Sequence, residues 1–571
     1  MRTASTDLLD ALTEAKVDYI FANFGSDHPA LIEAIAIYRN EGRPLPQIIT
    51  CPFEMVGLAA AHGHTMVSGR AQAVVVHVEC GTQSLAGAVH NAARARIPVL
   101  IFAGLSPATQ DGEARGSRNE FIQWIQDIHD QRSIVREYMK YAAELRSGLN
   151  VKQMVHRALQ FALSEPRGPV YLMGTREVME QEVQPVALDM RQWGPVEAAA
   201  LPESGVATVI QALEGAQRPL IVTSYLGRNP EAVAGLTRLC QRLGVGVLES
   251  VPSTLNFPHS DPLYQGSHWN HPFQNEALAE ADVVLVIDSD VPWIPTISRP
   301  REDARILHID VDPLKQSMPL WYIKAEHSYR ADAATALAQI NAELDRRGVD
   351  ARRAEQRRTH YAGKHAARAA RIREREAAPA TGEVTVEHLM ACLRPHLAQE
   401  GILLSEGITN YPQVIDHLAP TRPGSYFASG GGSLGWNGGA AIGAKLAAPD
   451  QTVVSVSGDG CYMFSVPSSV HWMARRYDTP FLQVVLNNGG WQAPRFSALS
   501  VHPSGHASRA ANLDLSFDPP PDYGAVAAAS GGALALRVER AAEVPAVLEQ
   551  ALEAVRKQRR CVVLDVVLKK R

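Results

Sequence analysis

The chain has 571 residues, of which 46% are hydrophobic and 20% are charged, and its formal net charge is −5. This length suits about three domains of ordinary size, and the composition is that of a globular protein. An acidic balance over so long a chain predicts neither a nucleic-acid partner nor a membrane partner. The six cysteines form no closely spaced pair, which predicts neither a disulfide framework nor a zinc site.

The beginning of the chain is amphipathic and charged, and it lacks the apolar stretch of a signal peptide. No apolar run reaches the roughly 18 residues that a membrane-spanning helix needs. Together with the cysteine pattern, these features predict a soluble cytoplasmic protein in a reducing compartment.

Short apolar runs alternate with helical patterns along most of the chain. In residues 1–180 such runs include AQAVVVHVEC and IPVLIFAG, and they are rich in Val and Ile on both faces, which is typical of buried parallel strands. Residues 195–345 and 383–571 repeat the same alternation. Strand–helix alternation predicts an α/β fold, here with three doubly wound parallel-sheet domains.

Residues 346–382 separate the second and third units and are rich in Arg and Ala. A basic surface for nucleic acid would interleave aromatic residues with the cations, and this segment does not. We therefore predict a solvent-facing helical linker.

Two polar motifs follow apolar runs in the third unit. Gly458–Asp459–Gly460 ends the run VVSVSGDG, and Asn487–Asn488 ends the next run, FLQVVLNN. Because parallel strands end at one edge of a sheet, the Asp459 carboxylate and an Asn amide oxygen should meet there. Such hard oxygen ligands suit Mg²⁺, which is usually bound together with phosphates, and glycines let backbone N–H groups approach phosphates closely. Ordinary strand-end turns would use the same residue types.

This spacing resembles the signature of thiamine diphosphate (ThDP) enzymes. The resemblance implies that Asp459, the Asn488 side chain and the Gly490 backbone oxygen bind Mg²⁺. Further cofactor contacts that it implies are Asn410, Gly458, Gly460 and Trp491. The three units match the family order of pyrimidine-binding domain (1–180), middle nucleotide-fold domain (195–345) and diphosphate-binding domain (383–571).

The resemblance also requires a glutamate that opens a helix in the first domain. Glu54, in QIITCPFEMVGLAAAHG, follows a short strand pattern and precedes the small residues that the family segment shares. By the resemblance, its carboxyl contacts the pyrimidine of the cofactor and activates it, which requires a pKa raised by burial. The neighbours Phe53, Met55 and Val56 are apolar, as this requires. A first-turn glutamate that merely stabilises the helix dipole is the alternative.

A Gly-rich stretch at residues 429–439 is the third element of the resemblance. Leu434 takes the place of the bulky apolar residue that lies beneath the bent cofactor, and the Gly432 carbonyl should accept from the cofactor's amino group. Ser433 lies between them and is a further cofactor contact. The same stretch contains a GxGxxG pattern that is typical of dinucleotide binding, but no acidic residue follows it at the usual ~20-residue spacing.

Substrate-side candidates lie in two loops. Residues 23–29 resemble the loop of benzoylformate decarboxylases that reaches the reacting carbon, so Ser26, Asp27 and His28 are candidate catalytic residues. Asp27 or His28 could move protons there, whereas helix capping is the alternative. Gln492 follows the second metal motif and is a further catalytic candidate, with a surface lid as its alternative.

The resemblance implies a ThDP- and Mg²⁺-dependent lyase or carboligase that acts next to a carbonyl. Acetolactate synthase-like carboligation of a 2-keto acid such as pyruvate is the leading prediction. The alternatives are a 2-hydroxyacyl-CoA lyase that yields formyl-CoA and a ketone or aldehyde, and a benzoylformate-type decarboxylase.

Two further expectations concern ligands and partners. The middle domain could bind ADP, FAD or CoA, and Arg228 and Lys315 are available for CoA phosphates. In the family, the pyrimidine and the diphosphate are held by different subunits. The resemblance therefore implies a homodimer or homotetramer in which Glu54 serves a cofactor held by Asp459 of another copy.

Overall fold

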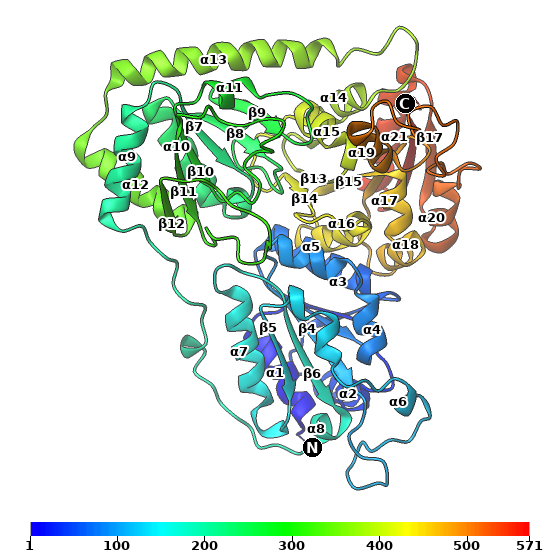
Figure 1. The fold of residues 1–571 in the computed structure, drawn as a ribbon. Coiled ribbons are helices and arrows are strands. Elements are labelled where there is room, and N and C mark those ends of the chain that lie inside the picture. The colour runs from blue at the N-terminus through cyan, green and yellow to red at the C-terminus, as the bar shows by residue number, and fades with distance from the viewer. Residues whose placement is uncertain (1, 570–571) are drawn as a thin grey trace.

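Three six-stranded parallel sheets follow one another along the chain in a computed structural model that describes residues 2–569 (Figure 1). Every strand pair within these sheets is parallel, and helices flank each sheet. The predicted α/β class with three doubly wound sheets is therefore confirmed. No helix among the described residues is both long and apolar enough to span a membrane.

The first sheet has the strand order β2-β1-β3-β4-β6-β5. Its strands are β1 (Tyr19–Ala22), β2 (Gln47–Thr50), β3 (Gln72–Val76), β4 (Val99–Leu105), β5 (Tyr141–Leu145) and β6 (Val170–Thr175). Its helices are α1 (Ala4–Glu14), α2 (Pro29–Glu41), α3 (Glu54–Ser68), α4 (Val78–Ser84), α5 (Ala88–Arg94), α6 (Ile122–Ile125), α7 (Val151–Leu163) and α8 (Arg176–Glu180).

The third sheet repeats this topology, with the order β14-β13-β15-β16-β18-β17. Its strands are β13 (Gly401–Glu406), β14 (Tyr426–Ala428), β15 (Thr452–Gly458), β16 (Leu482–Asn487), β17 (Leu534–Val538) and β18 (Val562–Val567). Its helices are α14 (Val386–Leu397), α15 (Tyr411–Leu418), α16 (Trp436–Ala447), α17 (Asp459–Phe464), α18 (Pro467–Arg476), α19 (Gln492–Val501), α20 (Tyr523–Gly531) and α21 (Val544–Arg556).

The middle sheet has the order β12-β11-β10-β7-β8-β9, which is the strand order of nucleotide-binding folds. Its strands are β7 (Pro219–Thr223), β8 (Gly246–Ser250), β9 (Tyr264–His268), β10 (Val283–Ile287), β11 (Arg305–Asp310) and β12 (His327–Arg330). Its helices are α9 (Glu203–Gly215), α10 (Pro230–Leu243), α11 (Glu276–Glu280) and α12 (Ala333–Arg347).

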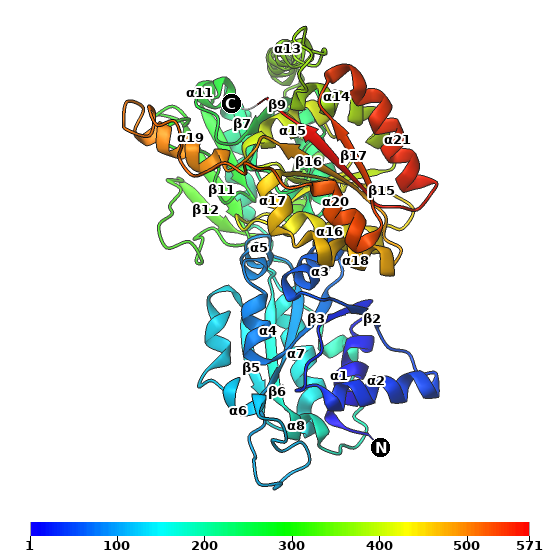
Figure 2. The same ribbon diagram turned by 90° about the vertical axis from the view of Figure 1, so that its right-hand side faces the viewer.

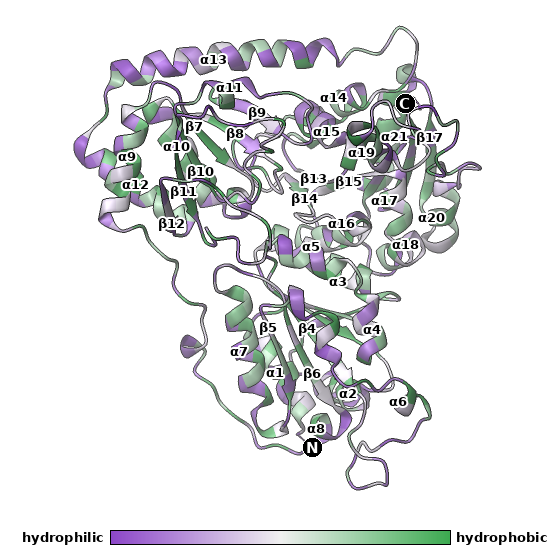
Figure 3. Cartoon of the chain, viewed as in Figure 1, coloured by the Kyte–Doolittle hydropathy of each residue, from purple (hydrophilic) through white to green (hydrophobic). Residues whose placement is uncertain are grey.

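The basic linker forms α13 (Ala351–Glu374), which lies along the top of Figure 1 and is largely hydrophilic (Figure 3). Its buried Arg357 donates to the carbonyls of Leu243 and Glu214, at 3.0 and 2.8 Å. Arg353 donates to Gly215 O at 2.6 Å. Because the last carbonyls of a helix have no partner within that helix, these cations satisfy the ends of α9 and α10. Arginines in the first half of α13 therefore attach this helix to the middle unit by hydrogen bonds to helix ends.

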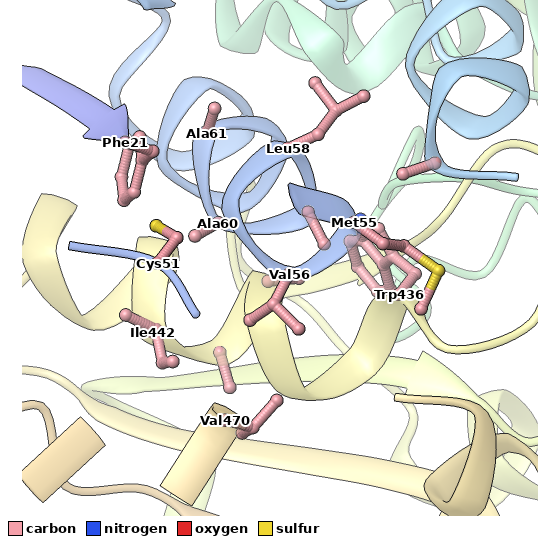
Figure 4. Close-up of a cluster of buried hydrophobic side chains, with 14 of the residues drawn as sticks. Phe21, Cys51, Met55, Val56, Leu58, Ala60, Ala61, Trp436, Ile442 and Val470 are labelled. Carbon is pink, nitrogen blue, oxygen red and sulfur yellow. The ribbon is translucent and has the colours of Figure 1, made fainter. Parts of the chain in front are cut away.

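The first and third units meet where α3 packs against α16 (Figure 4). A Cβ on Gly443 would lie only 1.9 Å from Ala60 O, so the two helix backbones approach as closely as a glycine allows. Met55, Val56 and Trp436 lie beside this contact and are buried. One continuous apolar core therefore joins the two units and holds the start of α3 beside the Gly-rich stretch.

Candidate active site

Asp459 lies where the two predicted metal motifs meet. β15 pairs with β16, so Asp459 follows one strand beside the residues that follow the other. The Asp459 carboxylate accepts from Gly460 N at 2.8 Å, from Gly489 N at 2.8 Å and from Gly490 N at 3.1 Å. Burial raises the pKa of Asp459, although these backbone bonds act in the opposite direction. A bound cation would offset the cost of burying this charge.

Asn488 offers a second oxygen to such a cation. Its Oδ1 atom is buried and has no hydrogen-bond partner. Buried acceptors are normally satisfied, so an orphaned amide oxygen next to a buried carboxylate is a site for a hard cation. These two side chains therefore fit Mg²⁺. Gly490, the third predicted ligand, lies beside them, since its N–H donates to the Asp459 carboxylate.

Glu406 anchors the Gly-rich stretch to the end of β13. Its carboxylate accepts from Gly435 N at 2.8 Å, from Asn437 N at 3.0 Å and from Asn437 Nδ2 at 2.6 Å. Burial raises the pKa of Glu406 to about 7 in spite of these bonds. In this segment only Asn410 was predicted from the sequence, as a cofactor contact. Its function as the anchor of α16 depends on the packing of β13 against α16, which no local pattern reveals.

Asn410 and Gln492 lie on the wall of one small cavity. This cavity has a volume of about 100 Å³, and Asn488 lines it as well. Asn410 ends the short 3₁₀ helix η6 (Ile408–Asn410), and Gln492 begins α19. The Gln492 Oε1 atom is buried without a partner. The structure therefore brings these predicted residues together at the carboxyl edge of the third sheet.

Trp491 closes the predicted diphosphate loop from one side. A Cβ on Gly460 would lie 2.2 Å from the Trp491 ring, so only glycine fits under it. The indole also packs edge-on against Phe464 and Phe517. Beyond Trp491, α19 has no buried residue and extends away from the body of the molecule (Figure 2).

The first unit covers the Gly-rich stretch through α5. His90 Nε2 accepts from Gly432 N at 3.0 Å. The Asn91 side chain donates to Ser433 O at 2.8 Å and accepts from Ser433 N at 3.1 Å. Leu434, the predicted residue beneath the cofactor, is half-buried beside these contacts. His90 and Asn91 were missed from the sequence because they belong to no recognisable motif.

Glu54 begins α3 and is buried in the first unit. Burial raises the pKa of its carboxyl, which is the direction that its apolar neighbours predict, and Asn23 Nδ2 donates to it at 2.9 Å. The next residue, Met55, reaches the Gly-rich stretch, where its Cε would lie 3.0 Å from a Cβ on Gly435. Within this one chain, Glu54 therefore opens a helix whose first turn touches the third unit.

His77 was missed from the sequence and lies in the same group of residues. It follows β3, just as Asn23 follows β1 and Glu54 follows β2, and these three strands are neighbours in the sheet. Its Nδ1 lies 2.5 Å from Asp27 Oδ1, and its Nε2 lies 3.1 Å from Gln126 Oε1. Since both ring nitrogens face oxygen acceptors, a doubly protonated imidazolium satisfies both contacts. His77 could have been found from the sequence, because it directly follows an apolar strand pattern of the same unit as Glu54.

The pKa of Asp27 is lowered and the pKa of its partner His77 is raised. The hydrogen bond to Asp27 and the charge of Asp27 raise the pKa of His77. Burial alone would raise the pKa of Asp27, but the imidazoles of His28 and His77 lower it below the usual range. Asp27 therefore stays ionised and favours the protonated form of His77.

His28 and Ser26 lie on either side of Asp27. His28 is buried against Phe24 and Phe102, and its Nδ1 accepts from Gly25 N at 3.1 Å. Ser26 is half-buried in the preceding turn. This burial places His28 where it positions Asp27, and it leaves His77 as the imidazole with access to the site.

The middle unit uses the two predicted CoA-binding cations internally. Lys315 Nζ lies 2.6 Å from Asp310 and 2.9 Å from Asp290. Arg228 lies 3.4 Å from Glu165 and 3.5 Å from Asp288. Because both cations are paired with carboxylates of the same chain, they do not form a free phosphate-binding surface.

Three family models match consecutive parts of the chain. The model described as the thiamine pyrophosphate enzyme N-terminal TPP binding domain matches residues 2–134. The central domain matches residues 206–340, and the C-terminal TPP binding domain matches residues 407–566. The matches follow the order of the three sheets.

Individual relatives are distant but cover most of the chain. A sulfoacetaldehyde acetyltransferase of Castellaniella defragrans is 25% identical over 99% of this chain and 93% of its own length. An acetolactate synthase large subunit of Parasynechococcus marenigrum is 23% identical over 85% of this chain and 76% of its own length. The structure of a ThDP-dependent 4-hydroxybenzoylformate decarboxylase of Rhodococcus jostii RHA1 matches with a TM-score of 0.79, at 21% identity and over 99% of both chains. With three consecutive family domains and the shared fold, this chain belongs to the thiamine pyrophosphate enzyme family.

Proposed function

We propose that this chain catalyses the ThDP- and Mg²⁺-dependent decarboxylation of a 2-keto acid. The observation that carries the proposal is the Asp27–His77 pair beside Glu54. After CO₂ leaves, the carbon that carried it must gain either a proton or a new carbon partner. An imidazole held protonated at this position favours the proton. We therefore rank decarboxylation above the acetolactate synthase-like carboligation that was the leading prediction from the sequence.

Each residue group has a distinct role in this proposal. Bound ThDP supplies the electron sink that accepts the charge left by CO₂. Glu54 holds a proton at the pyrimidine side, which its raised pKa allows. Asp459, Asn488 and Gly490 hold the Mg²⁺. His77, oriented by Asp27, donates the proton to the product carbon.

Carboligation of the same 2-keto acid is the second candidate. It is supported by the relatives, which include an acetolactate synthase large subunit and a sulfoacetaldehyde acetyltransferase. The 2-hydroxyacyl-CoA lyase reaction has less support, because Arg228 and Lys315 are neutralised within the middle unit. An ADP, FAD or CoA in the middle domain stays a prediction.

The test is a set of 2-keto acids incubated with ThDP- and Mg²⁺-loaded protein, with CO₂ and the carbon products followed by ¹³C NMR. Decarboxylation yields one aldehyde per CO₂, whereas carboligation yields a hydroxyketone or a hydroxyketo acid. Replacing His77 by Gln is expected to slow aldehyde formation by roughly 10²–10⁴-fold, because a proton donor in the reaction is lost. Aldehyde formation at the wild-type rate in that variant would rule out the assigned role.

The pH dependence of the rate gives a second prediction. The protonated form of His77 is the donor, and its pKa lies above the ordinary 6.5, so kcat should be constant at low pH and fall as pH rises through the raised pKa. Asp27→Asn removes the charge that raises this pKa, so the fall should begin at lower pH. The kcat–pH profile and an NMR titration of the His77 ring check this, and an unchanged midpoint in the variant would contradict it.

We also propose that the protein acts as a homodimer or homotetramer with sites shared between copies, as in the family resemblance. Glu54→Gln and Asp459→Ala subunits are each expected to be inactive. Mixed and reassembled together, they should regain part of the activity, because one of the shared sites then has both residues. Absence of recovery would place each site within a single chain, which the packing of α3 on α16 also allows.

A further inference from the structure

A cleft of about 800 Å³ lies between the middle and third units, outside the groups described above. Its walls come from the end of β9 and the loop after it, from α13, from α15 and from α19. We call it the α13 cleft and define it by Lys364, Arg368, Arg371, Arg375, His268 and Phe496.

One face of α13 lines the cleft with cations. Lys364, Arg368, Arg371 and Arg375 recur at helical spacing, so they lie on the same side of the helix. Lys364 pairs with Glu280 at 2.8 Å, and Arg368 pairs with Asp416 at 2.6 Å. Arg371 and Arg375 have no ion-pair partner within residues 2–569, and both are exposed. The cleft therefore carries two arginines whose charge the chain does not neutralise.

β9, which packs against α13, brings to the cleft a histidine that also lacks partners. His268 ends β9, is 3% exposed, and has no hydrogen-bond partner at either ring nitrogen. Burial lowers its pKa to about 4, so the ring is neutral near pH 7 and offers one N–H donor. Buried polar groups are normally satisfied, and an unsatisfied one in a cleft is available to a ligand.

The cleft continues toward the candidate active site. Phe496 and Thr409 line it, and they also line the small cavity that contains Asn488 and Gln492. Phe496 is on α19 and is 42% exposed, so an apolar surface lies between the cations and the active site. α19 therefore forms part of the walls of both the cleft and the small cavity.

We propose that the α13 cleft binds a small ligand through a dianionic group, either a phosphate or a dicarboxylate. Guanidinium groups form paired hydrogen bonds with such anions, and Arg371 and Arg375 are free to do so. The neutral His268 adds a donor without adding charge. This site is separate from the predicted Mg²⁺–diphosphate site, and anion binding to it can be measured whether or not the proposed reaction occurs. The dianion belongs either to the substrate or to a separate effector.

The test is isothermal titration of inorganic phosphate, and of succinate, into protein saturated with ThDP and Mg²⁺. Because ThDP already fills the diphosphate site, an anion that could bind only at that site gives no heat of binding. The double variant Arg371→Ala/Arg375→Ala should raise the Kd for the anion at least about tenfold, because charge-assisted hydrogen bonds are lost. Arg352→Ala with Arg373→Ala is the matched control, since it removes two exposed arginines of α13 that do not line the cleft.

Saturable binding of either probe that only the cleft variant weakens supports the site. Absence of saturable binding to the wild type, or equal weakening by the control pair, overturns it. Once 2-keto acid turnover is established, the same anion added to the assay separates the two sources. Competition that raises only KM assigns the dianion to the substrate, and a change in kcat at saturating substrate assigns it to an effector.

Discussion

Replacing Glu54 by Gln is expected to slow the exchange of the thiazolium C2 proton of bound ThDP with solvent deuterium by roughly 10²–10⁴-fold, because a proton-transfer partner is lost. The substitution keeps the size of the side chain, and its amide oxygen can still accept from Asn23. Folding and cofactor binding should therefore change little. Rapid-quench NMR of the bound cofactor measures the exchange without any substrate.

Glu33→Gln is the control for this prediction, because Glu33 is exposed on α2 of the same unit. Its exchange rate should equal that of the wild type. If Glu54→Gln exchanged as fast as this control, the Glu54 carboxyl would not contact the pyrimidine. In that case Glu54 would have only a structural role at the first turn of α3.

Replacing Asp459 by Ala is expected to weaken ThDP binding by at least about 10–100-fold, since even the loss of a group behind a metal ligand costs this much. The variant should also lose the dependence of ThDP binding on Mg²⁺. A second effect is expected on the apoprotein, because the Gly489 and Gly490 N–H groups lose their acceptor. The buried Gly490 N–H left without a partner costs about 1–3 kcal/mol of unfolding free energy.

Titrations of ThDP at several Mg²⁺ concentrations, together with denaturant unfolding of the apoprotein, separate the two effects. Asp450→Ala, at an exposed aspartate before β15, should change neither. Persistent Mg²⁺ dependence in Asp459→Ala would place the metal on other residues.

The sequence contained enough information for the architecture and for placing the two predicted metal motifs at one edge of a sheet. Apolar runs with buried character on both faces are typical of strands in a parallel sheet that helices cover on both sides, and their alternation with helical patterns indicated the class. Asp459 and Asn488 could be paired because each directly follows a strand, and parallel strands end at a common edge. Glu54 required the family resemblance, since a glutamate at a helix start is otherwise ordinary.

Only the tertiary structure showed how side chains from separate segments combine. His77 becomes a candidate proton donor because β3 lies next to β1 and brings it to Asp27. His28, in contrast, lies buried against Phe102, a contact between residues far apart in the sequence.

The cations show the same division between sequence and structure. From the sequence, Arg228, Lys315 and the arginines of α13 are all simply basic residues. In the structure, Arg228 and Lys315 are neutralised by carboxylates, Arg357 satisfies helix ends, and Arg371 and Arg375 line a cleft. The sequence by itself determined the sheets and the residues at their strand ends, because those follow from local periodicity. Which charges are paired and which are free was decided by packing, because each partner comes from a different part of the chain.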